Sequence, residues 1–237
     1  MPETNINVTL LTHTKDVEQT IVAAIRQCYS PKGGAELKET TKPEVTTRLI
    51  KQIIASGHTS TIEHASFTFA VQGVSRALTH QLVRHRVASY SQQSQRYVEE
   101  KNELAFIVPP KIKKNQLAQQ IYIDQVKLIH ENYKKLIAMG INKEDARYLL
   151  PNAAETKIII TMNARELLHF FEKRLCTRAQ WEIRILAGKM LFLVREVSPL
   201  IFSHAGPTCE TEKICWEGDL SCGKWKNIQG GELKSRI

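Results

Sequence analysis

The chain has 237 residues, of which 42% are apolar and 24% are charged, and its formal net charge is +9. This composition is typical of a folded protein with a buried core and excludes a disordered or fibrous chain. The excess of positive charge indicates anionic partners. We expect a cytoplasmic protein, because the first residues do not resemble a signal peptide and no apolar run approaches the roughly 20 residues that cross a bilayer.

Two strands and two helices are predicted in the first third of the chain. They are a strand over Asn7–Leu11, a helix over Lys15–Cys28, a helix from Pro43 to Gly57 and a strand over His64–Val71. Proline favours the first turn of a helix and glycine the position after its end, which gives the bounds at Pro43 and Gly57. The alternation of Phe67, Phe69 and Val71 predicts a strand that buries one face.

The middle of the chain is predicted to be mostly helical. Its elements are a helix from Gly73 to about Arg86, a polar loop over Val87–Arg96, a long helix over Asn115–Met139 and a short helix between Asn142 and Pro151. Gln81 and Arg84 are three residues apart and should share a face of the first of these helices. Gly140 should stop the long helix, and Arg147 lies on the short one.

A buried strand over Thr156–Met162 should lead into a helix with a clear start signal. Asn163 is expected to cap this helix, and Glu166 to reach back to it as a capping box. Arg165 and His169 share one face of the helix. The buried face should hold Leu167, Leu168, Phe171 and Leu175.

The last predicted helix runs from Gln180 to about Val197, where Pro199 ends it. Residues 204–237 are rich in glycine, proline and cysteine and are predicted to form an irregular tail. Residues 1–203 should form a single catalytic domain of the α+β class. Its mixed β-sheet would contain the strands near residues 7, 64 and 156 and would be flanked by two helical groups.

The five cysteines are too few and too unevenly spaced for a disulfide framework, and their odd number is typical of a reducing compartment. Cys28 follows the apolar pattern of the first helix and is predicted to be a small core residue. In the tail, His204 and the three cysteines that follow it have spacings that match no zinc pattern. We therefore predict no metal site.

No aspartate or glutamate occurs among the 35 residues from His64 to Val98, where the average density of the chain predicts about 3.5. The stretch also lacks lysine, so its positive charge comes only from arginine, whose guanidinium suits two-point contacts with phosphate. Residues 84–97 read RHRVASYSQQSQRY, two arginine clusters separated by hydroxyl and amide side chains. Such groups build phosphate or pyrophosphate sites, and a solvated basic loop is the alternative.

Residues 84–96 resemble the signature of flavin-dependent thymidylate synthases, RHR-x2-S-x-N-x2-S-x-R. Ser91 replaces the asparagine of the signature and keeps a hydrogen-bonding group. The other positions match at Arg84, His85, Arg86, Ser89, Ser94 and Arg96. Further blocks are similar to that family in the same order, namely GHTSTIEH at Gly57–His64, NARELLHFFEKR at Asn163–Arg174 and QWEIR at Gln180–Arg184.

The resemblance implies a fold and a reaction. The chain would have the fold of that family and would be a methyltransferase that converts dUMP to dTMP. 5,10-Methylenetetrahydrofolate would donate the carbon, NADPH would be the reductant, and FAD would transfer the hydride, giving tetrahydrofolate. The resemblance also implies a homotetramer with active sites at subunit interfaces, to which Gln81 and Arg84 would come from a neighbouring subunit.

The resemblance also implies which residues line the site. His58 should lie by the flavin ring, where the folate stacks. The residues implied for dUMP are Gln81, Arg84, Gln92, Gln93, Ser94, Gln95, Arg96, Arg147 and Arg174. The residues implied for FAD are Ser60, Arg84, His85, Arg86, Gln92, Asn163, Arg165 and His169.

Arg174 is the residue to which the resemblance gives a catalytic role, contact with the uracil ring in its ionised form. Methylation needs negative charge on the ring, and a desolvated guanidinium beside that charge stabilises the transition state. The alternative is a surface arginine near the negative end of a helix. A cysteine nucleophile is not predicted, because Cys176 has no evident activating partner.

Two other functions remain as alternatives. A nucleic-acid-binding module would use the acid-free arginine stretch, but such modules usually show lysine enrichment, a recognition helix or aromatic stacking platforms. Aromatic residues make up only 7% of this chain, so we expect neither a nucleic-acid partner nor a membrane partner. A flavin reductase acting on another nucleotide is the second alternative, and a test for dTMP formation separates it.

Overall fold

The structure is a computed structural model that describes residues 4–99 and 104–235. The described residues fall into two compact units. The first unit contains residues 4–7, 70–84, 90–99 and 104–160, and the second contains residues 8–69, 85–89 and 161–235. The predicted division into a domain over residues 1–203 and a tail over residues 204–237 stays a prediction.

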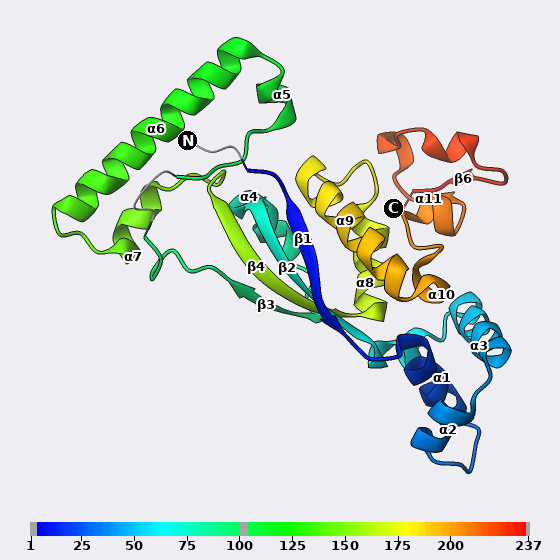
Figure 1. Cartoon of the computed structure of the whole chain (residues 1–237). Coiled ribbons are helices and arrows are strands. Elements are labelled where there is room, and N and C mark those ends of the chain that lie inside the picture. Colours follow the sequence, from blue (N-terminus) through cyan, green and yellow to red (C-terminus); the bar gives the residue numbers. More distant parts are fainter. Residues whose placement is uncertain (1–3, 100–103, 236–237) are drawn as a thin grey trace. The chain divides into compact units, whose positions relative to one another are not determined.

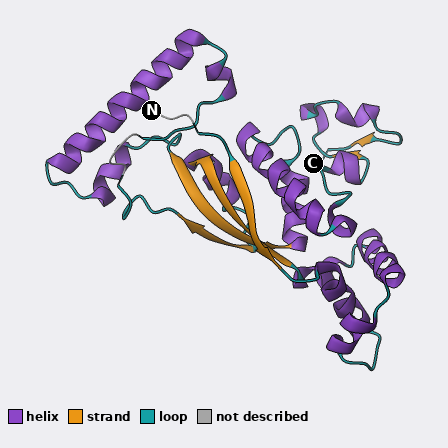
Figure 2. Ribbon diagram, viewed as in Figure 1, coloured by secondary structure: helices purple, strands orange, loops and turns teal. Residues whose placement is uncertain are grey.

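Four strands form one sheet in the order β1-β2-β4-β3 (Figures 1 and 2). In chain order the strands are β1 (Asn7–His13), β2 (Ser66–Ser75), β3 (Ala88–Gln92) and β4 (Glu155–Asn163). The three strands predicted from the sequence are confirmed as β1, β2 and β4. With the helices described below, they confirm the α+β class.

Alternation along the strands decides which side chains are buried. Phe67, Phe69 and Val71 of β2 are all buried, which confirms the predicted face. In β4, Ile158 is buried, whereas Ile159 is 44% exposed. The prediction that this strand is buried throughout is therefore wrong, because its side chains point alternately to two different faces of the sheet.

The loop predicted over Val87–Arg96 contains β3, so this prediction is wrong over half of its length. In β3, Ser89 and Ser91 are exposed while Tyr90 is partly buried. The Tyr90 hydroxyl donates a hydrogen bond to the Leu82 carbonyl at 2.9 Å. Because both faces of this strand carry polar groups, the sequence lacks the alternation of apolar and polar residues that identifies a half-buried strand.

The helix predicted from Gly73 to Arg86 is shorter than expected. Strand β2 continues to Ser75, whose hydroxyl caps α4 (Arg76–Leu82) by accepting from the Leu78 N–H at 3.0 Å. Gly73 lies inside the strand with φ +71°, where a Cβ atom would come 2.0 Å from the Asn5 carbonyl oxygen. Since α4 ends at Leu82, Arg84 follows the helix, and the predicted shared face with Gln81 is wrong.

Two predicted helices of the first unit have the expected start and stop signals. The long one is α6 (Gln116–Ala138), and the short one is divided into α7 (Lys143–Ala146) and the 3-10 helix η2 (Arg147–Leu149), which carries Arg147. The helix α5 (Pro110–Lys113) was not predicted. Asn115 caps α6 by accepting from the Ala118 N–H at 3.0 Å, and Gly140 follows the helix with φ +85°. Asn142 caps α7 in the same way, with the Asp145 N–H as donor.

The second unit begins with helices that follow β1. They are α1 (Val17–Gln27), α2 (Gly34–Thr40), α3 (Pro43–Ser56) and the 3-10 helix η1 (Thr59–His64). Pro43 begins α3, and Gly57 follows it with φ +74°, as predicted. The prediction that Cys28 is a core residue is wrong: α1 ends at Gln27, and Cys28 is exposed beyond it.

The C-terminal helices of the second unit are α8 (Ala164–Arg174), α9 (Trp181–Val197) and α10 (Pro199–Phe202). Asn163 caps α8, accepting from the Glu166 N–H at 2.9 Å, which confirms that part of the prediction. The capping box is wrong, because the Glu166 carboxylate bonds elsewhere. Of the predicted apolar face, Leu168 and Leu175 are only partly buried, and Phe170 is buried instead.

The segment after residue 203 contains short regular elements rather than only irregular chain. They are α11 (Thr208–Thr211), β5 (Ile214–Cys215), η3 (Gly218–Leu220), η4 (Lys224–Asn227) and β6 (Glu232–Leu233). Strands β5 and β6 pair in parallel. None of the helices in the described parts of the chain combines the length and apolar character needed to cross a bilayer.

Candidate functional site

A buried histidine links two charged residues of α8. His85 is only 5% exposed, and its Nδ1 lies 3.0 Å from a carboxylate oxygen of Glu166. Arg174 donates from Nε to His85 Nε2, also at 3.0 Å. A guanidinium can only donate, so Nε2 must accept and the ring proton must be on Nδ1, from which it is donated to Glu166. The contacts therefore fix one neutral tautomer of His85.

The electrostatics of the site agree with a neutral ring. Burial lowers the pKa of His85 from its ordinary value, and the nearby Arg174 charge lowers it further. The hydrogen bond to Glu166 opposes this shift without reversing it. At neutral pH the site is therefore a carboxylate and a guanidinium joined by a neutral imidazole, which holds the guanidinium in one orientation.

The helix periodicity explains why these groups meet. Glu166, Phe170 and Arg174 are four residues apart in succession, so they form one stripe along α8. The His85 ring packs edge-to-face on Phe170, with ring centroids 5.0 Å apart, and on His169, with centroids 5.5 Å apart. One face of α8 thus supplies most of the surroundings of His85.

Glu166 is the functional candidate that the sequence prediction missed. Glu166 was predicted only as part of a capping box with Asn163, and this local role was enough to explain an acidic residue at that position. The signal that could have identified it is the stripe with Phe170 and Arg174, because an acid on a buried face needs a partner. The carboxylate is 8% exposed and meets that need through His85.

This cluster also has the composition of a metal site. Among the described residues, His85, Glu166 and His169 offer ligand atoms that all lie within 4.8 Å of one another. However, His85 Nδ1 carries the proton donated to Glu166, and the lone pair of Nε2 accepts from Arg174. The adjacent guanidinium also repels a cation. The arrangement therefore favours a hydrogen-bonded relay over metal coordination.

The FAD candidates of the second unit lie mainly at the start of α8 and in η1. Ser60 belongs to η1, and Arg165 of α8 forms an ion pair with Glu63 of η1. The Ala164 N–H also bonds to the Ala65 carbonyl, at 2.8 Å. These contacts bring the two segments together and leave Arg165 exposed. Asn163 serves as the helix cap, and Arg86 is exposed.

Two arginines predicted to hold a phosphate converge in the first unit. Arg96 donates from Nη2 to the Glu144 carboxylate at 3.0 Å, and Arg147 donates from Nε to the Glu144 carbonyl at 3.1 Å. The Ser94 hydroxyl accepts from the Arg96 N–H at 3.2 Å. Glu144 was not among the predicted site residues, and its carboxylate occupies a position on Arg96 that an anion would take.

The glutamines between the arginine clusters are held by the first unit. Gln92 donates from Nε2 to the hydroxyls of Thr79, at 3.1 Å, and Thr156, at 3.2 Å. The Gln93 N–H bonds to the Lys157 carbonyl at 2.9 Å, and its carbonyl accepts from Arg76 at 2.8 Å. These bonds fix the backbone that leads to Ser94. Gln81 and Gln95 are partly buried and Arg84 is exposed.

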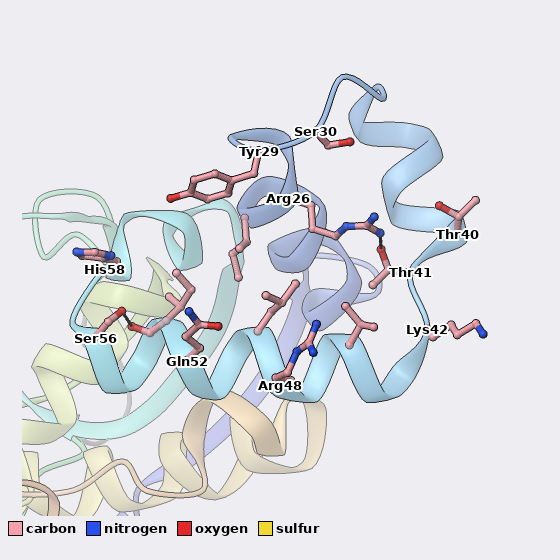
Figure 3. A pocket seen from close by; sticks show the side chains of 14 residues that line it. Arg26, Tyr29, Ser30, Thr40, Thr41, Lys42, Arg48, Gln52, Ser56 and His58 are labelled. Atoms are coloured by element: carbon pink, nitrogen blue, oxygen red, sulfur yellow. Dashed lines mark hydrogen bonds between the residues drawn. The ribbon is translucent and has the colours of Figure 1, made fainter.

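His58 borders a cavity of about 850 Å³ in the second unit. Helices α1 and α3 form most of its lining, and Figure 3 shows the side chains around it. Arg26, Lys42 and Arg48 bring positive charge, and none of the lining residues is acidic. Arg26 is held by a hydrogen bond to the Thr41 hydroxyl at 2.6 Å. The volume and charge suit an anionic small molecule.

Comparison with known proteins gives consistent matches over most of the chain. The sequence profile of the family described as "Thymidylate synthase complementing protein" matches residues 9–200. A protein of Geobacter sulfurreducens named "Flavin-dependent thymidylate synthase" is 49% identical over 225 residues, which cover 94% of this chain and 97% of that protein. A protein of the same name from Clostridium tetani is 46% identical, covering 92% and 94% of the two chains.

Solved structures show the same fold. A UMP/dUMP methylase PolB from Streptomyces cacaoi, bound with 5-Br UMP, is similar with a TM-score of 0.71. The two sequences are 26% identical, and the match covers 84% of this chain and 93% of that one. The structure of the same enzyme with 5-Br dUMP gives a TM-score of 0.76 at 24% identity, over 85% of this chain and 94% of that one.

Proposed function

Because the chain belongs to the thymidylate synthase complementing protein family, we propose that it is a flavin-dependent thymidylate synthase that converts dUMP to dTMP. In this proposal 5,10-methylenetetrahydrofolate donates the carbon and NADPH is the reductant, and tetrahydrofolate is released. The observation that carries the proposal is the buried Glu166–His85–Arg174 relay, which orients one guanidinium.

Arg174 has the chemistry that methylation of a uracil ring requires. Carbon C5 of uracil is a poor nucleophile, so negative charge must build on the ring before a bond to carbon forms. A guanidinium held in place beforehand stabilises that charge at little reorganisation cost. His85 and Glu166 are positioning residues, because they would act on the uracil ring only through Arg174.

The side chains of the second unit fit a flavin dinucleotide. Arg86 and Arg165 are exposed cations suited to a pyrophosphate, and Ser60 adds a hydroxyl in the segment that contacts α8. FAD supplies hydride chemistry when it is bound. His58 would lie beside the flavin ring, and the cationic cavity that it borders would receive an anionic part of the folate.

The Arg96–Glu144–Arg147 group of the first unit would bind the dUMP phosphate. A phosphate dianion competes well with a single exposed carboxylate, because charge-assisted hydrogen bonds to guanidinium are strong. It would replace Glu144 on Arg96, while Ser94 keeps the backbone of Arg96 in place. The chain would act as a homotetramer, with Gln81 and Arg84 supplied by a neighbouring subunit.

The direct test is product analysis by chromatography and mass spectrometry. Purified protein with FAD, dUMP, 5,10-methylenetetrahydrofolate and NADPH should form dTMP and tetrahydrofolate in equal amounts. Omitting any one substrate should abolish dTMP. Oxidation of NADPH with no dTMP under complete conditions would support a flavin reductase instead, and a protein that stays colourless after addition of FAD would contradict both.

A further inference from the structure

Four of the five cysteines meet in the second unit, although they are scattered in sequence. A cavity of about 20 Å³ is lined by Cys176, Cys209, Cys215 and Cys222. Cys176 follows the end of α8, and the other three come from α11, β5 and the turn before η4. All four are free thiols. The cavity has room for one water molecule or ion and excludes an organic ligand.

A tight turn holds two of these cysteines near one another. The sulfur of Cys215 lies 3.3 Å from the Ser221 hydroxyl, and the same hydroxyl accepts from the Gly223 N–H at 3.1 Å. Gly223 follows Cys222 with a φ of +81°, the left-handed conformation that glycine tolerates. The turn therefore places Cys222 beside the serine that contacts Cys215.

Charged side chains also surround the cavity. Arg178, Glu217 and Lys224 line it; Arg178 pairs with Glu217 at 3.8 Å, and Lys224 pairs with Glu210. Because these charges balance, the negative charge that would hold a divalent cation comes from the four sulfurs themselves.

We propose that these four cysteines bind one zinc ion, which closes the C-terminal segment onto the end of α8. Four thiolates in tetrahedral arrangement are a common structural zinc site, and soft sulfur ligands favour zinc over magnesium or calcium. On binding, the four thiols release their protons to solvent and each sulfur donates a pair to the metal. The site lies outside the proposed flavin and nucleotide residues and does not depend on the proposed function.

The spacing of the sulfurs adds a structural consequence. Zinc–sulfur bonds of about 2.3 Å place the sulfurs about 3.8 Å apart in a tetrahedron. Outside the His85 cluster, no three ligand atoms of described residues lie within 4.8 Å of one another. The cysteines are therefore near one another but not yet at bonding positions. Binding should draw the tail segments together and make them more resistant to proteolysis.

Metal analysis of tag-free, full-length protein tests the site without any activity assay. Protein expressed in zinc-supplemented medium and purified without chelators should contain about one zinc ion per chain, as measured by inductively coupled plasma mass spectrometry. Cys209→Ser and Cys222→Ser should lose most of it. Cys28→Ser is the matched control, because Cys28 is an exposed cysteine outside the cavity. Full zinc in Cys209→Ser, or equal loss in Cys28→Ser, would overturn the assignment.

A second measurement covers the case in which the variants fail to fold. Cobalt added to metal-free wild-type protein should give intense thiolate-to-cobalt charge-transfer bands and the visible bands of a tetrahedral ion, saturating at about one equivalent. Zinc should then remove both. Wild-type protein that lacks zinc and gives no such bands under reducing conditions would overturn the proposal. Disulfides between these cysteines in protein purified under reducing conditions would also overturn it.

Discussion

The orientation of Arg174 depends on where one proton sits on His85. With the proton on Nδ1, the ring donates to Glu166 and accepts from Arg174, so both neighbours are satisfied at 3.0 Å. With the proton on Nε2, the ring would present a donor to a donor and an acceptor to a carboxylate. Glu166 thus selects the tautomer that can hold the guanidinium.

Arg174→Ala should lower turnover at saturating dUMP by about a hundredfold or more, because it removes a group that stabilises charge formed in the transition state. Stability should fall by about 1–3 kcal/mol, because the buried Nε2 of His85 loses its donor. Steady-state dTMP formation and thermal unfolding measure the two effects. Lys189→Ala, which removes an exposed cation of α9, is the control. Near-normal turnover in Arg174→Ala would refute the catalytic role.

The lowered pKa of His85 predicts a pH-dependent stability. The unfolded chain, with a histidine pKa of about 6.5, binds this proton more readily than the folded protein does. The stabilising contribution is therefore complete above about pH 6.5 and is lost as the pH falls toward the lowered folded pKa. The slope is at most about 1.4 kcal/mol per pH unit for one proton.

Urea unfolding at several pH values measures this contribution. His85→Gln can still donate to Glu166 and accept from Arg174, but it does not titrate. The loss of stability on acidification below about pH 6.5 should therefore be smaller in His85→Gln than in the wild type. His64→Gln, at an exposed histidine, should behave like the wild type. Identical pH profiles for wild type and His85→Gln would contradict the shift.

Arg96→Ala should affect binding more than turnover. A phosphate contact is present in both the ground state and the transition state, so its loss raises the KM for dUMP and leaves kcat nearly unchanged. A charge-assisted hydrogen bond of about 1.5–3 kcal/mol corresponds to a rise of roughly 10- to 150-fold. Lys127→Ala, at an exposed lysine of α6, is the control. A fall in kcat with normal KM would assign Arg96 to the chemistry instead.

At the scale of secondary-structure elements, local signals predicted more than the hydrophobic pattern did. The starts of α3, α6, α7 and α8 follow from Pro43, Asn115, Asn142 and Asn163, because a cap or an N-terminal proline acts within one turn. Strand β3 was missed, since what makes it a strand is its pairing in the sheet and not its own composition.

The candidate site residues show the same difference between local signals and contacts with distant segments. Arg96 and Arg174 could be predicted as site residues, because the signature region and the end of α8 identify them by residue type alone. The stripe of Glu166, Phe170 and Arg174 on α8 could have identified Glu166 but not its partner His85, and the cysteine cavity could not be found at all, because both depend on contacts between segments far apart in sequence. Cys176 joins the three tail cysteines only after α8 and the tail have folded together within the second unit.

Gly73 gives a prediction about the element in which it lies. Its φ of +71° is unfavourable for other residues, and a Cβ atom would meet the Asn5 carbonyl oxygen at 2.0 Å. Gly73→Ala should therefore cost the strain of about 1–2 kcal/mol plus the cost of displacing the backbone at Asn5. Gly140→Ala, at φ +85° with nothing within 4 Å, should cost the strain alone.

Chemical unfolding of both glycine variants separates these effects. The free energy of unfolding should fall more in Gly73→Ala than in Gly140→Ala, with the same denaturant dependence in both. Equal losses would mean that the close approach to Asn5 does not persist in solution.

At the scale of the whole molecule, the predicted site residues are divided between the two units. The dUMP candidates from Gln92 to Arg96, together with Arg84 and Arg147, belong to the first unit, and Arg174 belongs to the second. The proposed homotetramer assigns Arg84 and Arg174 of one active site to different chains. In a symmetric assembly two chains can exchange such groups reciprocally, so that each interface builds equivalent sites.

Mixing two inactive variants tests this shared site. Arg84→Ala and Arg174→Ala should each be nearly inactive as homo-oligomers. When the two variants are coexpressed in equal amounts, their chains mix at random. A site is then active when the chain that supplies its Arg84 has an intact Arg84 and the chain that supplies its Arg174 has an intact Arg174. Each condition holds about half the time, so roughly a quarter of the sites should be active.

The opposite arrangement gives a different result. If one chain supplied both arginines to a site, every site in a mixed oligomer would carry one defect, and mixing would restore nothing. Distinguishable affinity tags on the two variants allow mixed oligomers to be purified before dTMP formation is measured. A wild-type and Arg174→Ala mixture, prepared in the same way, sets the scale, because about half of its sites should be active in either arrangement. Verified mixed oligomers of the two variants without a gain in activity would therefore exclude the shared site.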